Sequence, residues 1–573
     1  MCRSKIQLVA SIAVTILLIF GVFATLSIDS DFGKIETTTV IIEDDNRELS
    51  GLLYKPKSAD APNPAPAVVV AHGISGSKEM MSSIGLELAR RGFVSLCLDL
   101  LGHGKSQGSV KEGTVDRSFG VYSAVQYLKS QPYVNSSSLG LVGHSLGAGA
   151  VRATVAREPQ VGATILVAGG LGNTAEEPEY GVFNSTYPRN LLVIVGKYDV
   201  LFDVKKLTSE ELPAAFGTQQ EILPGVLYGE FAANTARKLV LPSTTHLFEP
   251  MDPTTIAETV AWIEDSLGKR QNPASLLNPR LIYVQREAAI LLALAGLVGT
   301  TVLSFSPINK LIHSASERET PKDDKATSLK WRLYAFWASV NLVLLFPMSA
   351  VGSAIAFPPL IFGSSIAWWM MTSGSVGLLG LAKFSGRIFG KTFSLKQTLK
   401  DNFSKKEAVG SVISFALIFT IATILAGGFN FTFRIITPIF RDFTAARALV
   451  FPAFIPFFFL YFTAEGLLLH DLPRHSSNTI RKQIRNYAET LIGKTLPFVV
   501  LLVIHYSGKI LFDFWILPGF AGFLMEFLWL ILPIFVITTS ISWSFHKNTK
   551  RIFYGALLNA LLMSWVASVV FPF

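Results

Sequence analysis

The sequence contains few cysteines and few charged residues. Its two cysteines are Cys2, at the start of the first apolar segment, and Cys97, in an expected buried strand. We therefore expect no disulfide between them, and no cysteine spacing is typical of a metal site. Charged residues make up only 16% of the chain and hydrophobic residues 50%, whereas soluble domains are about 25% charged. This composition is typical of a protein with membrane-spanning segments.

The charge is divided unevenly along the chain. Residues 29–285 contain 22 Lys and Arg and 28 Asp and Glu, a net charge of −6. Residues 286–573 contain 26 Lys and Arg and 13 Asp and Glu, a net charge of +13. The basic excess thus belongs to the apolar half, where it is expected to mark cytoplasmic loops. Because no compact basic domain exists, binding to nucleic acid is not expected.

The first apolar segment runs from Ile6 to Ile28 and follows Arg3 and Lys5. A bilayer is crossed by about 20 helical residues, whereas a signal peptide has an apolar core of about 7–15. The length favours an uncleaved anchor over residues 1–28. A cleaved signal peptide is the alternative, because residues 22–27 offer a weak cleavage site.

The last part of the chain, residues 286–573, is a series of long apolar segments. With the anchor, we predict nine spans, the other eight lying near 287–306, 333–355, 358–381, 409–429, 448–469, 493–512, 515–541 and 551–571. If the N-terminus is cytoplasmic, the four cytoplasmic loops carry 6, 7, 5 and 3 Lys and Arg, and the other short loops carry 0, 3 and 1. This pattern predicts that residues 29–285 and the C-terminus lie outside the cytoplasm.

Residues 29–285 alternate short apolar runs with helical patterns, which lie near residues 79–90, 115–129, 146–157 and 254–267. Continuous apolar runs favour strands that are buried on both faces, so the alternation predicts a mostly parallel, doubly wound α/β sheet. A Pro-rich stretch, residues 62–66, separates an antiparallel entry hairpin from the parallel part. The expected strands are Ile35–Ile42, Leu49–Tyr54, Ala67–Ala71, Phe93–Leu98, Leu139–Val142, Thr164–Val167, Leu191–Val195 and Lys238–Leu241.

A Gly-His-Ser-Leu-Gly motif at residues 143–147 is the strongest chemical signal. It follows an expected strand and precedes a helical pattern, which is the context of a nucleophile elbow. In such a turn the flanking glycines let the strand and the helix approach each other. The motif predicts Ser145 as a nucleophile.

A serine hydroxyl needs a base to take its proton and an acid to orient that base. His246 follows the last expected strand and is the candidate base. Asp199 follows the strand before it and is the candidate acid, with Asp203 as the fallback. For the oxyanion, we expect the backbone N–H of Leu146, next to the nucleophile, and that of Ile74, in the loop after an earlier strand.

Residues 35–270 resemble the α/β-hydrolase superfamily, nearer its dienelactone-hydrolase, monoglyceride-lipase and serine-aminopeptidase-like branches. The matching pieces are His72-Gly73, a D-x-x-G-H-G-x-S turn at 99–106, the motif at 143–147, residues 196–199 and His246. The resemblance implies an α/β-hydrolase fold and hydrolysis of an ester, thioester or amide without a metal or cofactor. In this family the turn at 99–106 is usually structural. The short segment 168–190 predicts a small cap or none, and residues 200–237 are a possible partial cover or simply surface helices.

Together these features predict a membrane-tethered serine esterase that acts on a small or lipid-like acyl substrate. A serine peptidase with the same triad is one alternative, and a transporter or sensor whose hydrolase-like domain only binds ligand is another. Ionisable residues inside a bilayer are costly and often functional. Four candidates in the apolar half are Glu465, which could reach the inner interface, and His505, Lys509 and Glu526, which could line a polar cavity near the outer leaflet.

Overall fold

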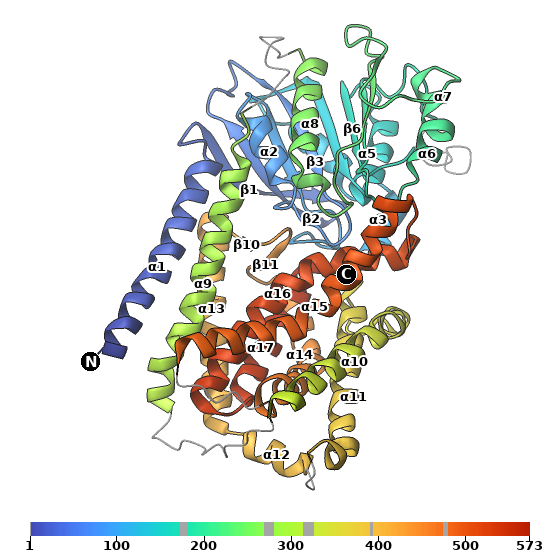
Figure 1. Cartoon of the computed structure of the whole chain (residues 1–573). Helices are drawn as coiled ribbons and strands as arrows, with labels where there is room; N and C mark the ends of the chain where they lie inside the picture. Colours follow the sequence, from blue (N-terminus) through green and yellow to red (C-terminus); the bar gives the residue numbers. More distant parts are fainter. Residues whose placement is uncertain (1, 172–181, 269–279, 313–325, 390–393, 474–478) are drawn as a thin grey trace.

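The computed structural model describes residues 2–171, 182–268, 280–312, 326–389, 394–473 and 479–573. A sheet domain, built from the elements between Ile35 and Ser266, lies on one end of a region of long helices, the helical region, which runs from Tyr283 to Val570 (Figure 1). Helix α1 (Cys2–Asp29) precedes the sheet domain and packs along α9 (Tyr283–Ile312), which follows it. The segments that enter and leave the sheet domain therefore run side by side.

The sheet has nine strands in the order β1-β2-β4-β3-β5-β6-β7-β9-β8. Its central strands are parallel, while β2 is antiparallel to both of its neighbours and β8 is antiparallel to β9. The bounds are β1 Ile35–Asp44, β2 Arg47–Pro56, β3 Ala65–Ala71, β4 Val94–Leu98, β5 Val134–His144, β6 Ala163–Val167, β7 Leu191–Ile194, β8 Leu227–Tyr228 and β9 Arg237–Val240. The predicted doubly wound sheet, its entry hairpin and all eight predicted strands are confirmed. The sequence did not reveal β8, which has two residues.

Helices cover both faces of the sheet, and this explains the continuous apolar runs of its strands. Val69 packs with the cluster that contains α4 and α5, whereas Val68 and Val70 pack with the cluster that contains α2 and α8. The helices are α2 Ser82–Ala89, α3 Val110–Asp116, α4 Val121–Lys129, α5 Leu146–Arg157, α6 Val204–Lys206, α7 Leu212–Phe216 and α8 Pro253–Ser266, with a π-helical turn at Leu207–Glu211 and a 3₁₀ turn at Glu249–Met251.

One predicted helix is divided in two. A continuous helix was expected near residues 115–129, but α3 ends and α4 begins within it. Arg117 caps α3 with φ 65°, and Gly120 precedes α4 with φ 89°, so the backbone is left-handed at both ends of the break. Residues in this conformation end a helix, which is why the expectation of one helix was wrong. Residues 172–181 of the segment expected to lack a large cap lie outside the described residues.

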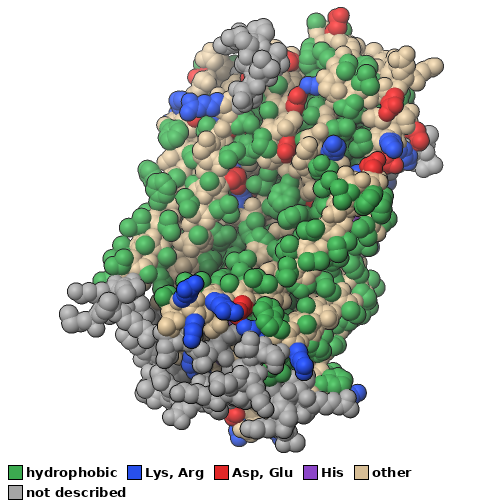
Figure 2. Space-filling view, in the orientation of Figure 1, with side chains coloured by type: hydrophobic (Ala, Val, Ile, Leu, Met, Phe, Trp, Pro, Cys, Tyr) green, Lys and Arg blue, Asp and Glu red, His purple; other side chains and the backbone are tan. Residues whose placement is uncertain are grey.

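Long helices make up the rest of the chain. They are α10 Ala326–Ile355, α11 Gly363–Phe389, α13 Lys405–Phe429, α14 Ala445–Glu465, α15 Ile480–Phe512, α16 Gly519–Thr549 and α17 Phe553–Val570, with a short helix α12 Leu395–Asn402, a π-helical turn Gly466–Asp471, and a hairpin of β10 Phe433–Arg434 and β11 Pro438–Phe440. Figure 2 shows hydrophobic side chains over the visible face of these helices.

Within the described residues, eight helices are long and apolar enough to cross a membrane: α1, α9, α10 and α13 to α17. They coincide with eight of the nine predicted spans. The ninth, near 358–381, forms α11, which packs between α10 and α14 but is not among the eight. Ten of its 27 residues are Gly or Ser. The orientation in the membrane and the domain limits at 28 and 285 stay predictions.

Buried ion pairs join the sheet domain to the helical region. Arg441, just after β11, lies with its Nη1 3.2 Å from Oε2 of Glu79, and Lys78 places its Nζ 2.6 Å from Oδ2 of Asp99. The exposed fraction of each of these four side chains is 7% or less. Burial alone would raise the pKa of Asp99, but Lys78 and Arg441 outweigh it and hold that pKa well below its usual value. The two carboxylates are therefore charged and balanced by two cations.

The turn at Asp99–Ser106 is a second point of contact. Arg447 of α14 donates from Nε to the Gly104 carbonyl at 2.8 Å and from Nη1 to the Phe571 carbonyl at 2.9 Å. The C-terminal residue Phe573 donates its N–H to the Gly102 carbonyl at 3.1 Å. The turn that the family resemblance implied to be structural therefore docks the sheet domain on the helical region.

Replacing Arg441 by Ala should destabilise the whole chain strongly, because it leaves Glu79 and Asp99 buried with a single cation. Removal of one partner from a buried ion pair typically costs about 3–5 kcal/mol. Thermal unfolding of the full chain in detergent measures the effect. Arg485→Ala is the matched control, because Arg485 is 77% exposed where it pairs with Glu489, and such pairs contribute about 0–1 kcal/mol. Equal losses from the two variants would contradict a structural role for the buried pair.

Candidate active site

Ser145 lies at a sharp turn between β5, which ends at His144, and α5, which begins at Leu146. Its backbone has φ 53° and ψ −114°, a conformation that is strained for any residue with a side chain. A side chain at Gly147 would place its Cβ 2.6 Å from the carbonyl oxygen of Ala71, so only glycine allows this approach of α5 to β3. The turn holds the Ser145 side chain at the end of the strand.

The three side chains that the sequence singled out form a continuous hydrogen-bonded chain. The Ser145 hydroxyl lies 3.0 Å from Nε2 of His246, and Nδ1 of His246 lies 2.8 Å from Oδ2 of Asp199. Oδ1 of Asp199 accepts the N–H of Leu201 at 2.8 Å. His246 and Asp199 are buried and Ser145 is partly exposed. This order, from a buried carboxylate to a partly exposed hydroxyl, suits proton transfer from the hydroxyl to the imidazole.

The sheet explains how residues 47 to 101 positions apart meet. Ser145 follows β5, Asp199 follows β7 and His246 follows β9, and these strands run in the same direction. The carboxyl ends of parallel strands lie at one edge of a sheet, which is where open α/β sheets bind their ligands.

The charge near His246 favours its protonated form. Burial alone would lower the pKa of His246, but the Asp199 carboxylate opposes it and accepts a hydrogen bond from the ring, and the net pKa lies above its usual value. Glu526, from helix α16 of the helical region, acts in the same direction. The site can therefore stabilise an imidazolium, which forms when His246 takes a proton.

Asp203 does not reach this site. Its carboxylate caps α6, accepting the N–H of Lys205 at 2.9 Å, and the residue is exposed. The fallback acid is therefore a helix cap, and Asp199 is the residue beside the imidazole.

The two expected oxyanion donors belong to residues close to Ser145. Leu146 is the first residue of α5, and the first N–H groups of a helix have no acceptor within it. Ile74 lines the same pocket as Ser145. A Cβ at Gly73, just before Ile74, would lie 3.0 Å from the Cβ of Ser145, so the glycine lets this loop approach the nucleophile.

Two buried residues that the sequence did not single out support His246 and Asp199. His144 donates from Nε2 to the His246 carbonyl at 3.0 Å. Glu249 accepts the N–H of Gly196, in the loop before Asp199. Burial and the neighbouring Asp199 raise the pKa of Glu249 well above its usual value. Their signal in the sequence is their position, one before the nucleophile and three after the base.

His144, His246 and Glu249 each place one possible ligand atom within 4.8 Å of the others, which is close enough to hold a metal ion. The ring nitrogens of His246 already contact Ser145 and Asp199. A metal bound there would compete with these hydrogen bonds, so the chemistry of the donors fits the hydrogen-bonded chain better than a metal centre.

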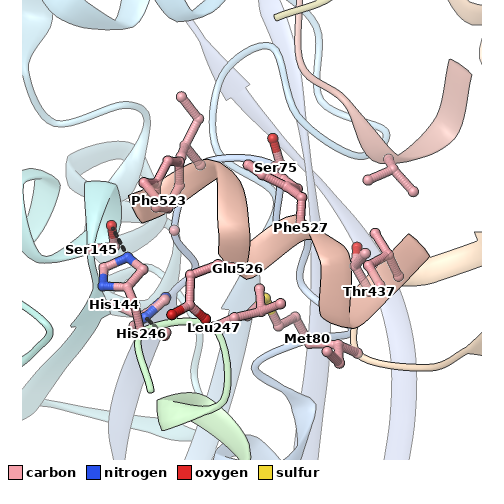
Figure 3. A pocket seen from close by; sticks show the side chains of 15 residues that line it. Ser75, Met80, His144, Ser145, His246, Leu247, Thr437, Phe523, Glu526 and Phe527 are labelled. Carbon is pink, nitrogen blue, oxygen red and sulfur yellow. Dashed lines mark hydrogen bonds between the residues drawn. The ribbon is translucent and has the colours of Figure 1, made fainter. Parts of the chain in front are cut away.

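A pocket of about 520 Å³, part of it open to solvent, lies over Ser145. Both parts of the protein line it. The sheet domain contributes Gly73, Ile74, Ser75, Met80, His144, Ser145, His246 and Leu247, and the helical region contributes Ile436, Thr437, Phe523, Glu526, Phe527, Leu530 and Val570. Figure 3 shows Glu526 on α16 facing the side chains of Ser145 and His246. The sequence left residues 200–237 open as a partial cover of the site, but the described lining includes no residue of this segment. Residues of α16 cover the pocket instead.

Glu526 forms hydrogen bonds with residues of both the sheet domain and the helical region. Its Oε2 accepts the hydroxyl of Thr245, the neighbour of His246, at 2.9 Å, and its Oε1 accepts the hydroxyl of Tyr506 at 2.7 Å. Glu526 thus lines a pocket, as expected, but the pocket is the one over Ser145. In the sequence, the signal for a role of this residue was the presence of an acidic side chain within an apolar segment.

The other three candidates of the apolar half have different neighbours. His505 stacks on Trp515 with ring centroids 4.8 Å apart, and Lys509 pairs with Asp513 at 2.7 Å. The described lining of the pocket over Ser145 contains neither of them. Glu465 is buried beside Lys494, with an oxygen–nitrogen distance of 2.9 Å.

Part of the sheet domain is similar to known hydrolases. Residues 49–229 match the Dienelactone hydrolase family. Over 104 residues the chain is 30% identical to the uncharacterized protein YcjY of Escherichia coli, an alignment that covers 18% of this chain and 34% of that protein. The family match confirms the expected α/β-hydrolase fold and identifies a hydrolase domain.

Three solved structures each match about two fifths of this chain. The esterase Est1E of Butyrivibrio proteoclasticus with bound ferulic acid is 19% identical, covers 39% of this chain and 96% of its own, and has a TM-score of 0.29. The dienelactone hydrolase of Anabaena variabilis is 20% identical, with coverage of 41% and 97% and a TM-score of 0.27. The Pyrococcus furiosus esterase Pf2001 is 20% identical, with coverage of 42% and 96% and a TM-score of 0.31.

Replacing Asp199 by Asn should lower kcat about 10⁴-fold, because the amide no longer holds the imidazole in the required tautomer or balances its charge. Asp203→Asn is the matched control and should change kcat less than about twofold, because its carboxylate only caps a short helix. Steady-state hydrolysis of a p-nitrophenyl ester measures both. If Asp203→Asn were the more damaging change, the assignment of the acid would be wrong.

Replacing Glu526 by Gln should shift the acid limb of the pH profile of kcat/KM to lower pH. A base must be neutral to act, so activity falls as the pH drops through the raised pKa of His246, above its ordinary value of about 6.5. The variant removes a negative charge that raises this pKa. Glu258→Gln, which removes a surface partner of Lys238, should leave the limb in place. An unchanged limb in Glu526→Gln would show that this carboxylate does not act on the base.

Proposed function

We propose that this dienelactone hydrolase family domain is a membrane-tethered serine hydrolase that cleaves carboxylic esters through an acyl-enzyme. The observation that supports the proposal is the hydrogen-bonded chain from Asp199 through His246 to the hydroxyl of Ser145. A domain that only binds ligand has no physical need for these three groups in this order. The strained backbone at Ser145 adds support, because strain of this kind persists where function requires it.

In the first half of the reaction, the Ser145 oxygen attacks the carbonyl carbon of the ester while its proton moves to Nε2 of His246. The carbonyl π electrons move to the oxygen, whose negative charge is stabilised by the N–H groups of Leu146 and Ile74. Asp199 stabilises the imidazolium. When the tetrahedral intermediate collapses, the bond to the leaving oxygen breaks, and His246 gives that oxygen its proton.

In the second half, a water molecule attacks the acyl group on Ser145. His246 takes the water proton and returns it to the Ser145 oxygen as the acyl bond breaks, which releases the acid and restores the enzyme. Every step uses side chains and N–H groups of this chain and water.

The helices hold this site at a membrane. Helix α1 and helix α9 flank the sheet domain and are both candidate spans. In Figure 2, Lys and Arg side chains gather at the end of the helical region that lies away from the sheet domain. Since basic residues favour the cytoplasmic side, we place the sheet domain on the opposite side, with a lipid-like or other amphiphilic acyl compound as its substrate.

Replacing Ser145 by Ala should abolish covalent labelling by a fluorophosphonate probe and lower ester hydrolysis about 10⁴- to 10⁶-fold, because the nucleophile is lost. Gel fluorescence and p-nitrophenyl ester turnover of the full chain in detergent measure the two effects. Ser209→Ala, at an exposed serine of the π-helical turn, is the control and should behave as the wild type.

The same experiment separates the alternatives. Faster Ser145-dependent cleavage of aminoacyl amides than of esters would replace the esterase with a peptidase. If the folded wild-type protein is not labelled, the nucleophile is inactive, and a binding domain of a transporter or sensor becomes the better interpretation.

A further inference from the structure

The pocket over Ser145 has one wall that the hydrolase domain does not supply. Phe523, Phe527 and Leu530 of α16 form part of its lining. They are spaced by four and three residues, so they share one face of the helix. Figure 3 shows Phe523, Glu526 and Phe527 on α16, with Glu526 extending toward the catalytic side chains. A membrane helix therefore presents an apolar face to the nucleophile.

We infer that this face of α16 binds the hydrocarbon chain of the substrate, and that the substrate is an amphiphile taken from the bilayer. The inference rests on the proposed function and adds to it the surface that binds the hydrocarbon chain and the bilayer as the source of the substrate. The ester group lies at Ser145, and the chain lies along Phe523, Phe527 and Leu530.

The position of the wall along α16 argues for a bilayer source. The apolar span begins at Ala521, so the three wall residues lie in its first three turns. This is the level at which a spanning helix enters the hydrocarbon of the membrane. An ester at Ser145 is thus next to the boundary between polar and apolar regions, where the ester groups of amphiphiles lie.

The chemistry of the wall argues for a hydrocarbon chain. Ile436 and Val570, from the hairpin region and from α17, extend the apolar surface of α16. Glu526 interrupts it, but both of its carboxylate oxygens already accept hydrogen bonds, from Thr245 and Tyr506. What this wall offers a ligand is therefore mainly apolar surface, which binds methylene groups without specific hydrogen bonds.

A hydrocarbon site has a measurable signature in chain length. Each methylene that becomes buried in the pocket should raise kcat/KM up to about fourfold until the pocket is full. The volume of the side chains that line the pocket sets the preferred length. Phe527 is the best position to alter because it is large, 8% exposed and in the middle of the wall.

The experiment uses the full chain in detergent and two series of esters. One series contains p-nitrophenyl esters from acetate to palmitate, and the other contains acetates of linear alcohols of matched length, so that a chain on either side of the ester is detected. Phe527→Ala enlarges the pocket and should move the optimum to longer chains. Phe527→Trp fills it and should move the optimum to shorter chains. Rates for each variant are expressed relative to its own rate with the shortest ester.

Phe512→Ala is the matched control, because Phe512 is 70% exposed at the end of α15 and is not part of the described pocket lining. Its chain-length profile should equal that of the wild type. If both Phe527 variants keep the wild-type profile in both series while turnover still depends on Ser145, the inference is overturned and the proposed function stands. If no ester in either series is cleaved in a Ser145-dependent way, the proposed function itself fails.

Discussion

The structure depends on the docking of the carboxyl edge of the sheet against the helical region, which buried charges hold in one arrangement. Lys78, Glu79 and Asp99 of the sheet domain meet Arg441 of the helical region with almost no exposure to solvent. A buried charge without a partner is very costly. Sliding of one part over the other would separate these partners, so the ion pairs fix where the helices lie relative to Ser145. Because the parallel strands place Ser145, Asp199 and His246 at this same edge, the docking also encloses the active-site residues.

The sheet and its three candidate catalytic residues could be predicted because their signals are local. A buried parallel strand has a continuous apolar run, as in Val68–Val70, and the residue after it lies at the carboxyl edge whatever the rest of the chain does. Ser145, Asp199 and His246 each follow such a run. The break between α3 and α4 could not be predicted in the same way, because it depends on backbone angles at Arg117 and Gly120 that the helical pattern around them does not reveal.

Contacts between the two parts of the protein had no such signal. Thr245 and Glu526 are 281 residues apart and form a hydrogen bond. In the sequence, neither a Thr beside the candidate base nor a Glu in an apolar segment indicates this pairing. The cost of burying an acid indicated that Glu526 has a partner but not which one. Likewise, the sequence gives no sign that Arg441, in a loop between spans, faces Glu79 and Asp99. Pairings of this kind are decided by tertiary packing and become visible only when the parts are placed together.

The hydrogen bond between Thr245 and Glu526 connects α16 to the residue before His246, so α16 does more than cover the pocket over Ser145. Thr245 precedes His246, whose imidazole contacts both Ser145 and Asp199. A shift of α16 along its axis would break this bond, move a carboxylate relative to the imidazole and change the apolar wall at the same time. In the proposed function, the base and the substrate pocket therefore respond together to the packing of α16. In the proposed function, the helical region therefore contributes to hydrolysis without any transport, because it forms one side of the pocket over Ser145.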